Sequence, residues 1–262
     1  MKRVLSFLAL LVTLSSLTYA KIIETDHFEE LCSYVAEDTL IILDIDDTLL
    51  IPTQMLGCDE WFLHQLKKHQ NAGMNYTQAL EKGLAEWEAI RHLTKMKIVE
   101  PGTEKIIAAL QKQNCCIIGL TTQGLALATR TSKQLKEHHI DLTITAPSKE
   151  DVFFQSQGHG LLFRNGILFT SATNKGEALF KLCEKIGYSP KRIIFINDKE
   201  THVKELEMVA EKKQVECVGL RYAYADAHKA AFRPEVAEYQ FSHSSFDKIL
   251  SDEEALAKIV TP

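Results

Sequence analysis

Two aspartates separated by one residue, Asp44 and Asp46, follow directly on the apolar run of residues 40–43. A carboxylate at the end of a buried strand can attack a phosphorus atom and form an aspartyl-phosphate. A second carboxylate, brought alongside by a turn, can protonate the leaving oxygen and later activate water. Because two close carboxylates repel each other, a divalent cation with oxygen ligands is expected beside them. Followed by Thr48, the pair predicts magnesium-dependent phosphate chemistry rather than an acidic surface turn.

A second apolar run, residues 115–120, ends in Thr121 and Thr122. Hydroxyl groups and backbone N–H groups at such a strand end can hold a phosphoryl oxygen. Threonine also favours the position before a helix, so capping is an alternative role. The two roles are compatible, and both place these threonines at the edge of a sheet.

Lys175 stands at the start of a helical pattern that runs through residues 178–186. A cation at the N-terminus of a helix is unfavourable for the helix dipole. An anionic partner would offset that cost, and phosphate together with the Asp44 carboxylate is the predicted partner. The alternative for a lone lysine is a solvated surface group.

A third apolar run, residues 193–196, ends in Asn197 and Asp198. The Asp198 carboxylate is a candidate ligand for the cation, and Asn197 offers a neutral oxygen. The alternative is a polar turn between a strand and a helix. Because Asn197 is neutral, only Asp198 of this pair adds negative charge to the predicted site.

Short apolar runs without alternation are typical of buried strands in a parallel sheet. Helical patterns separate these runs, and such alternation predicts an α/β fold with a doubly wound sheet. Ligands bind at the carboxyl ends of the strands in such sheets, which gathers the polar residues into one site. The further predicted strands cover residues 142–145 and 215–220, and the predicted helices cover residues 104–113, 125–137 and 178–186.

Two segments interrupt the alternation. Residues 51–100 carry a helical pattern without a convincing strand and end at Pro101-Gly102, which predicts a small helical cap inserted into the core. Asn165-Gly166 lies between two apolar runs in residues 160–170 and predicts a β-hairpin flap. Trp61, Phe62, Trp87 and Arg91 lie in this cap, and aromatic residues at helical spacing are more typical of a core than of ligand contacts.

In chain order, Asp44-x-Asp46-x-Thr48, Thr121, Lys175 and Asn197-Asp198 resemble the first, second, third and fourth motifs of the haloacid-dehalogenase-like (HAD) superfamily of phosphohydrolases. Many relatives carry an acid at the position of Asn197, and the loss of that charge would weaken the affinity for a metal ion. The hairpin and the acidic tail at residues 251–255 look similar to an exported HAD-like family of unknown function. The resemblance implies a Rossmann-like core over residues 21–50 and 101–262 with the cap at 51–100. It implies a phosphatase that hydrolyses a small phosphomonoester, and dehalogenases of the superfamily lack the acid at position 46. The implied roles are catalysis by Asp44, Asp46 and Lys175, phosphate binding by Thr48, Thr121, Thr122 and Lys175, and Mg²⁺ binding by Asp44, the Asp46 backbone carbonyl and Asp198.

The N-terminus has its own composition. Lys2 and Arg3 precede an uncharged, mostly apolar stretch at residues 4–17, and Ala20 follows it. This order predicts an export signal over residues 1–20, with an uncleaved anchor as the alternative. After cleavage no stable membrane insertion is expected, and the protein would reside in the periplasm or be secreted. The six cysteines have no metal-ligand spacing, and a disulfide among them is left open.

Charged residues make up 25% of the chain and give it a formal net charge of −5. An acidic chain without a basic run is a poor candidate for binding nucleic acid. The resemblance implies a small phosphorylated compound as the partner, and the oligomeric state is left open. A phosphotransferase or nucleotidase shares the same core motifs. The principal alternative is a secreted HAD-like binding or interaction protein with weak or no catalysis, which Asn197 favours; a solute-binding module would need two similar lobes.

Overall fold

A sheet of eight strands organises the part of the chain that the computed structural model describes, residues 22–245 and 247–260. Its order is β1-β10-β9-β2-β5-β8-β7-β6, and the first six strands in that order run parallel. The strands are β1 (Ile23–Thr25), β2 (Thr39–Leu43), β5 (Cys116–Thr121), β6 (Val152–Ser156), β7 (His159–Arg164), β8 (Ile167–Phe169), β9 (Arg192–Asn197) and β10 (Glu216–Tyr222).

The centre of the sheet is β2, whose five side chains are all buried. It pairs with β5 on one side and β9 on the other, so that Leu43 lies opposite Gly119 and Ile196. The carboxyl ends of these three strands therefore lie together at one edge. The predicted strands at residues 39–43, 115–120, 193–196 and 215–220 are confirmed.

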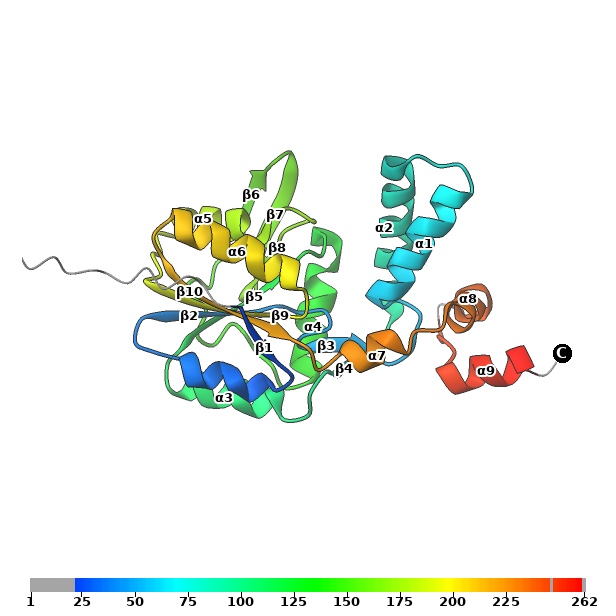
Figure 1. Cartoon of the computed structure of the whole chain (residues 1–262), viewed down its shortest axis with the longest axis horizontal. Coiled ribbons are helices and arrows are strands. Elements are labelled where there is room, and N and C mark those ends of the chain that lie inside the picture. Colours follow the sequence, from blue (N-terminus) through cyan, green and yellow to red (C-terminus); the bar gives the residue numbers. More distant parts are fainter. Residues whose placement is uncertain (1–21, 246, 261–262) are drawn as a thin grey trace, which may run out of the picture.

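Helices cover both faces of the sheet, which explains why the central strands do not alternate (Figure 1). On one face lie a 3₁₀-helix η1 (Phe28–Tyr34), α3 (Thr103–Lys112), and α4 (Ala128–Glu137), which the single 3₁₀ turn η2 (Leu125–Leu127) precedes. On the other face lie α5 (Lys175–Ile186) and α6 (Glu200–Lys212). The predicted helices are confirmed, and the fold is a mixed α/β fold with a mostly parallel sheet.

The predicted hairpin forms, but it extends the main sheet. Asn165 and Gly166 have φ angles of 52° and 75°, as a tight turn between β7 and β8 requires. β8 pairs in parallel with β5, and β7 pairs antiparallel with β8 and with β6, a strand that the sequence did not reveal. The predicted strand at residues 142–145 is wrong. Those residues form a turn, because the Asp141 carboxylate accepts bonds from the Thr143 N–H and hydroxyl groups.

The cap consists of two helices, α1 (Asp59–Asn71) and α2 (Tyr76–Leu93), which stand beside the layered core in Figure 1. The Cys58 thiol accepts the Trp61 N–H at the start of α1, and Asn75 forms a capping box with Gln78 at the start of α2. Two strands were missed in this segment. β3 (Leu50–Pro52) and β4 (Met96–Ile98) pair antiparallel at the base of the cap, and three residues each are too short to show a periodic pattern.

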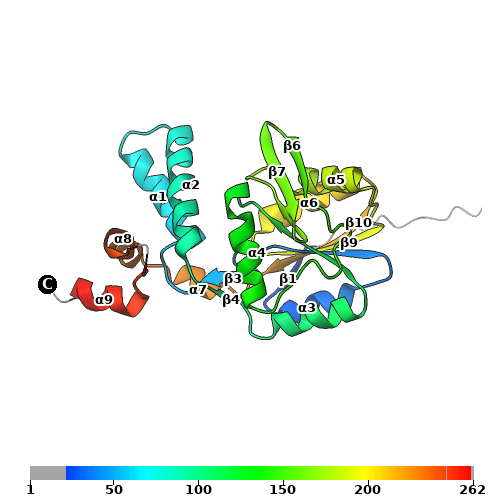
Figure 2. The ribbon, with the colours of Figure 1, turned by 180° about the vertical axis from the view of Figure 1, so that it is seen from behind.

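Three helices follow β10: α7 (Asp226–Ala230), α8 (Pro234–His243) and α9 (Asp252–Val260). Both views place α8 and α9 on the side of the cap, away from the sheet (Figures 1 and 2). Ala237 of α8 shares an apolar cluster with Trp61 and Trp87 of the cap. The predicted core range 101–262 therefore includes two helices that pack on the insertion.

The expected export signal at residues 1–20 lies outside the described residues. Within residues 22–245 and 247–260 no helix has the length and apolar character needed to cross a membrane. All six cysteines fall in these ranges and carry free thiols.

Candidate active site

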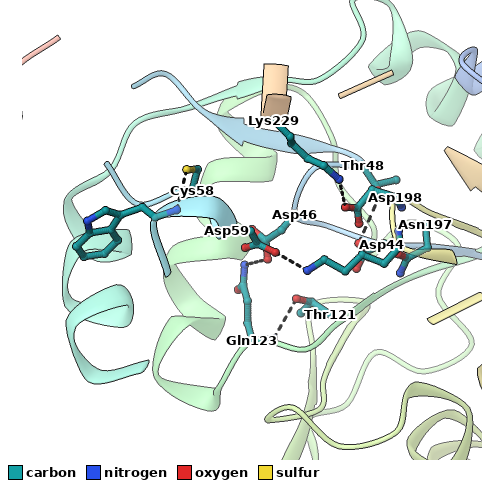
Figure 3. Close-up of polar contacts among 12 residues, drawn as sticks. Asp44, Asp46, Thr48, Cys58, Asp59, Thr121, Gln123, Asn197, Asp198 and Lys229 are labelled. Carbon is teal, nitrogen blue, oxygen red and sulfur yellow. Dashed lines mark hydrogen bonds and ion pairs between the residues drawn. The ribbon is translucent and has the colours of Figure 1, made fainter. Parts of the chain in front are cut away.

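A tight turn after β2 brings the two aspartates of the first motif to the same edge of the sheet (Figure 3). Asp44 still belongs to the sheet, because its N–H donates to the Ile196 carbonyl at 3.1 Å. The Ile45 carbonyl then accepts the N–H groups of residues 49 and 50, both at 2.9 Å. Asp47 adopts φ 58°, a left-handed conformation that aspartate tolerates. The turn that the paired-carboxylate hypothesis required is present.

Asp44 and Lys175 form a buried ion pair. The side chain of Lys175 is 1% exposed, and its Nζ donates to Asp44 Oδ1 at 2.5 Å. Burial raises the pKa of Asp44, and the charge of Lys175 opposes that rise. Lys175 is the first residue of α5, so an anion at this helix start offsets the unfavourable position of its charge.

Thr48 connects the first motif with the fourth. Its hydroxyl lies 3.5 Å from Asp44 Oδ2 and accepts the Asp198 N–H at 3.1 Å. Burial and then the charge of Asp44 raise the pKa of Asp198 to about 6. One fully buried hydroxyl group thus links the Asp44 carboxylate to the backbone of Asp198. We call Asp44, Thr48, Lys175 and Asp198 the sheet side of the site; the predicted contact of Thr48 with phosphate stays a prediction.

Asn197 does not supply the free oxygen that was expected of it. Its side-chain Oδ1 accepts the Lys199 N–H at 2.7 Å and so fixes the turn after β9. Its Nδ2 is buried and has no hydrogen-bond partner among the described residues. The residue therefore shapes the strand end, and an amide nitrogen is a donor rather than a metal ligand.

The threonines after β5 lie at the same edge of the sheet. Thr121 is buried, and its hydroxyl accepts the Gln123 N–H at 3.1 Å. Thr122 is half-buried, and its backbone carbonyl accepts the Ala172 N–H at 2.9 Å. The predicted phosphate contacts of both hydroxyls stay predictions.

Asp46 is held by two residues that the sequence did not assign to the site. Gln123 Nε2 donates to Asp46 Oδ2 at 2.8 Å, and the Thr131 hydroxyl fixes this amide by donating to Gln123 Oε1 at 2.6 Å. Arg91 Nη2, from α2 of the cap, forms an ion pair with Asp46 Oδ1. Arg91 was placed in the cap by its position in the sequence but had no predicted role, and its guanidinium group lies at the site. Burial raises the pKa of Asp46, and Arg91 is the largest influence against that rise.

A second ion pair joins the cap to the core beside Asp46. Lys199 Nζ contacts Asp59 Oδ2, at the first residue of α1. Burial acts to raise the pKa of Asp59, but the charge and hydrogen bond of Lys199, together with the charges of Arg91 and Lys229, outweigh it and the pKa is lowered. We call Asp46, Asp59, Arg91 and Lys199 the cap side of the site. Lys199 follows the fourth motif directly and was open to prediction on that ground; Asp59 gave no such signal.

One more cation reaches the sheet side. Lys229 Nζ, from α7, donates to Asp198 Oδ2 at 2.8 Å (Figure 3). No spacing in the sequence connects these two residues, because the contact depends on how α7 folds back after β10. Gln123, in contrast, stands two residues after Thr121 at the same strand end, and this position alone could have indicated a place at the site.

The donor set of the sheet side fits a hard divalent cation. In residues 22–245 and 247–260 no three His, Cys, Asp or Glu side chains converge as a metal site. The expected set needs only two such side chains, the Asp44 and Asp198 carboxylates, with a backbone carbonyl as the third oxygen. Oxygen ligands suit Mg²⁺.

A family described as "Protein of unknown function (DUF2608)" matches residues 24–256, which include every site residue named above. The chain belongs to this family. Among similar proteins are two from Chlamydia pneumoniae, both named "Putative outer membrane protein". One is 24% identical over 89% of this chain and 88% of its own length, and the other is 27% identical over 85% and 82%. An uncharacterized protein of Rickettsia prowazekii is 24% identical over 84% of both chains.

Two solved structures resemble this DUF2608 member. One is a haloacid dehalogenase-like hydrolase from Streptococcus pneumoniae, with a TM-score of 0.46 and 14% identity over 69% of this chain and 83% of that chain. The other is a HAD-superfamily hydrolase from Ehrlichia chaffeensis, with a TM-score of 0.40 and 13% identity over 74% and 95%. The structural neighbours are thus HAD-superfamily hydrolases.

Proposed function

We propose that the protein is a magnesium-dependent phosphatase that hydrolyses a small phosphomonoester through an aspartyl-phosphate at Asp44. One observation carries the proposal. A buried aspartate at the carboxyl end of the central strand is held between a buried lysine and a second carboxylate, with a threonine hydroxyl of the neighbouring strand end nearby. A carboxylate nucleophile with a phosphate-binding cation beside it is the minimum that this reaction needs.

In the first step an Asp44 carboxylate oxygen attacks phosphorus, and the bond between phosphorus and the ester oxygen breaks. The leaving alkoxide takes a proton from Asp46. In the second step water attacks the phosphorus of the aspartyl-phosphate, and Asp46 takes the proton that the water loses. Inorganic phosphate leaves, and both aspartates return to their initial states.

The residues around the two aspartates suit these roles. The charge of Lys175 opposes the rise in the pKa of Asp44 that burial causes, and Lys175 is placed to bind a phosphoryl oxygen. Burial raises the pKa of Asp46, which favours the protonated form that the first step requires. Gln123 fixes one oxygen of Asp46, and the other oxygen, which pairs with Arg91, is the one that would exchange a proton with the leaving group.

The carboxylates of Asp44 and Asp198 and the backbone carbonyl of Asp46 are the residues that would hold Mg²⁺. When bound, the ion would neutralise charge on the phosphoryl group. Lys229 pairs with the Asp198 carboxylate, and the Thr48 hydroxyl links the Asp44 carboxylate to the Asp198 backbone N–H.

An exported location belongs to the same proposal. The N-terminal composition predicts an export signal, and relatives that match more than four-fifths of the chain are named as outer membrane proteins. A phosphatase in the cell envelope would act on small phosphorylated compounds outside the cytoplasm.

The test is magnesium-dependent phosphate release from an aryl phosphate and from a broad panel of phosphomonoesters. Asp44→Asn is the control, because it keeps the shape of the side chain and removes the nucleophile. Its rate should fall by about 10⁴-fold or more. Chelation of the metal should abolish release by the unmodified protein, and a trifluoroberyllate adduct should form only with Asp44 intact.

Release no greater than that of Asp44→Asn across the panel would defeat the proposal. Magnesium binding without turnover would instead favour the second candidate, a HAD-like binding protein. Asn197 favours that candidate, because its oxygen is engaged by the Lys199 N–H and one acid is missing from the fourth motif.

A further inference from the structure

We infer that Arg91 is a specificity-determining residue that binds a second anionic group on the substrate. The preferred substrates would then be phosphomonoesters that carry a carboxylate or another phosphate. This inference rests on the proposed function, because it adds a second contact to the same site. It is carried by the surroundings of Arg91 in the cap.

The guanidinium group of Arg91 carries five N–H donors, and of its two hydrogen bonds to the described residues only one is to a strong acceptor. The side chain is 3% exposed, lies over the Trp87 ring at 5.1 Å, and pairs through Nη2 with a single oxygen of Asp46. Its Nη1 contacts Met96 Sδ at 3.1 Å, and a thioether is a weak acceptor. Guanidinium groups match carboxylates and phosphates best through two parallel hydrogen bonds.

The neighbouring ring of Trp87 carries a buried donor without an acceptor. Trp87 Nε1 is buried, and it has no hydrogen-bond partner among the described residues. An unpaired buried donor is costly, as is a buried cation with few acceptors. A ligand with several acceptor oxygens would lower both costs, whereas a neutral apolar group would leave them in place.

The position of Arg91 connects this binding to the reaction. Asp46 must exchange a proton with the leaving group, yet one of its oxygens is engaged by Arg91 and the other by Gln123. An anion on the leaving group would replace the carboxylate on Arg91 and free that oxygen, while Gln123 keeps the other in place. Lys199 remains paired with Asp59 during this exchange, so the second ion pair of the cap side is kept.

Three phosphate esters with the same three-carbon chain test the inference: propyl phosphate, 3-phosphonooxypropanoate and propane-1,3-diyl bisphosphate. Their equilibrium binding is measured by calorimetry with magnesium on Asp44→Asn, which prevents turnover. The two esters with a second anion should bind about 10- to 100-fold more tightly than propyl phosphate. Whichever of the two binds more tightly identifies the second group as a carboxylate or a phosphate.

Adding Arg91→Met should abolish the preference while propyl phosphate still binds, and Arg91→Lys should keep part of it. Arg233→Met is the matched control, because this exposed arginine pairs with Glu235 outside the site. Steady-state kinetics should show the same loss as a higher KM for the two esters that carry a second anionic group. Equal binding of all three esters to the parent protein would overturn the inference even if Arg91→Met does not fold. A preference that survives Arg91→Met would overturn it as well. If none of the esters binds and the unmodified protein releases no phosphate from them, the proposed function itself fails.

Discussion

The sheet side and the cap side of the site each hold a buried aspartate against a cation, but different parts of the chain assemble them. On the sheet side, Asp44 and Lys175 come from the end of β2 and the start of α5, both within the layered core. On the cap side, Asp46 comes from the core and Arg91 from α2 of the insertion. The first pair is fixed by the parallel sheet, whereas the second exists only while the cap lies against the core.

This difference separates chemistry from selectivity. The sheet side keeps its geometry without the cap, because strand pairing and the Thr48 hydroxyl position Asp44 and Asp198. The cap side contributes groups whose contacts a ligand can replace. Substitutions on the sheet side should therefore affect all substrates alike, and substitutions on the cap side should affect substrates unequally.

The largest effect is expected from Lys175→Met. Asp44 would remain buried without its cation, which should lower the free energy of unfolding by about 3–5 kcal/mol. Phosphate release should fall by about 10³-fold for every substrate, because a charge that stabilises the phosphoryl group is lost. Urea unfolding and phosphate-release assays measure the two effects.

The double variant Asp44→Asn/Lys175→Met is the control for that pair. It removes both charges, so it should regain part of the lost stability and none of the activity. Strictly additive losses of stability would show that Asp44 and Lys175 do not depend on each other, and the sheet side would not be a coupled unit.

The sheet side could be predicted from sequence because each of its parts has a local signal. A buried parallel strand appears as an apolar run, and its carboxyl end is the residue where that run stops. This rule placed Asp44, Thr121 and Asp198 at one edge of the sheet, and the position of Lys175 at a helix start predicted its anionic partner Asp44. Thr48 was recognised as part of the motif, but its bridge from Asp44 to the Asp198 N–H follows from three-dimensional packing.

The cap side could not be predicted in the same way. Arg91 lies among apolar residues of α2, and only the placement of the whole helix brings it to Asp46. Lys229 reaches Asp198 by an equally long-range route through α7. The strands β3 and β4 were not predicted, because a strand of three residues is too short to show an alternating pattern. Residues 142–145 were wrongly predicted as a strand, because hydrogen bonds to the Asp141 side chain stabilise a turn there.

A smaller effect is expected from Gln123→Leu, which tests how Asp46 is positioned. Asp46 would lose the donor to its Oδ2, and the Thr131 hydroxyl would lose its acceptor. Phosphate release should fall by about 10- to 100-fold through misplacement of the acid. The free energy of unfolding should fall by about 1–3 kcal/mol.

Thr131→Val provides the matched control for Gln123. It removes the hydroxyl that orients the amide but leaves the amide itself beside Asp46. Its loss of activity should be smaller than that of Gln123→Leu when both are compared by kcat. An unchanged kcat in Gln123→Leu would mean that Arg91 alone positions Asp46, and the division of roles on the cap side would be wrong.

The smallest effect on catalysis is expected from Gln240→Met, far from both sides of the site. Gln240 is fully buried in α8; its Oε1 accepts the Leu56 N–H at 2.9 Å, and its Nε2 donates to Asp252 Oδ1 at 2.8 Å. Asp252 in turn accepts the Met55 N–H at 2.9 Å, so these bonds tie the linker that enters the cap to the C-terminal helices.

Methionine fills a similar volume but leaves the buried Leu56 N–H without an acceptor, which should cost about 1–3 kcal/mol of stability. Thermal unfolding measures that cost, and amide hydrogen exchange at residues 55 and 56 should accelerate. The exposed Gln70→Met on α1 is the control and should change neither quantity. Because Gln240 touches no residue of the site, kcat should stay within about threefold of the unmodified protein. A loss of kcat as large as that of Gln123→Leu would show that the C-terminal helices set the position of the cap during turnover, and the cap side would then extend as far as α8.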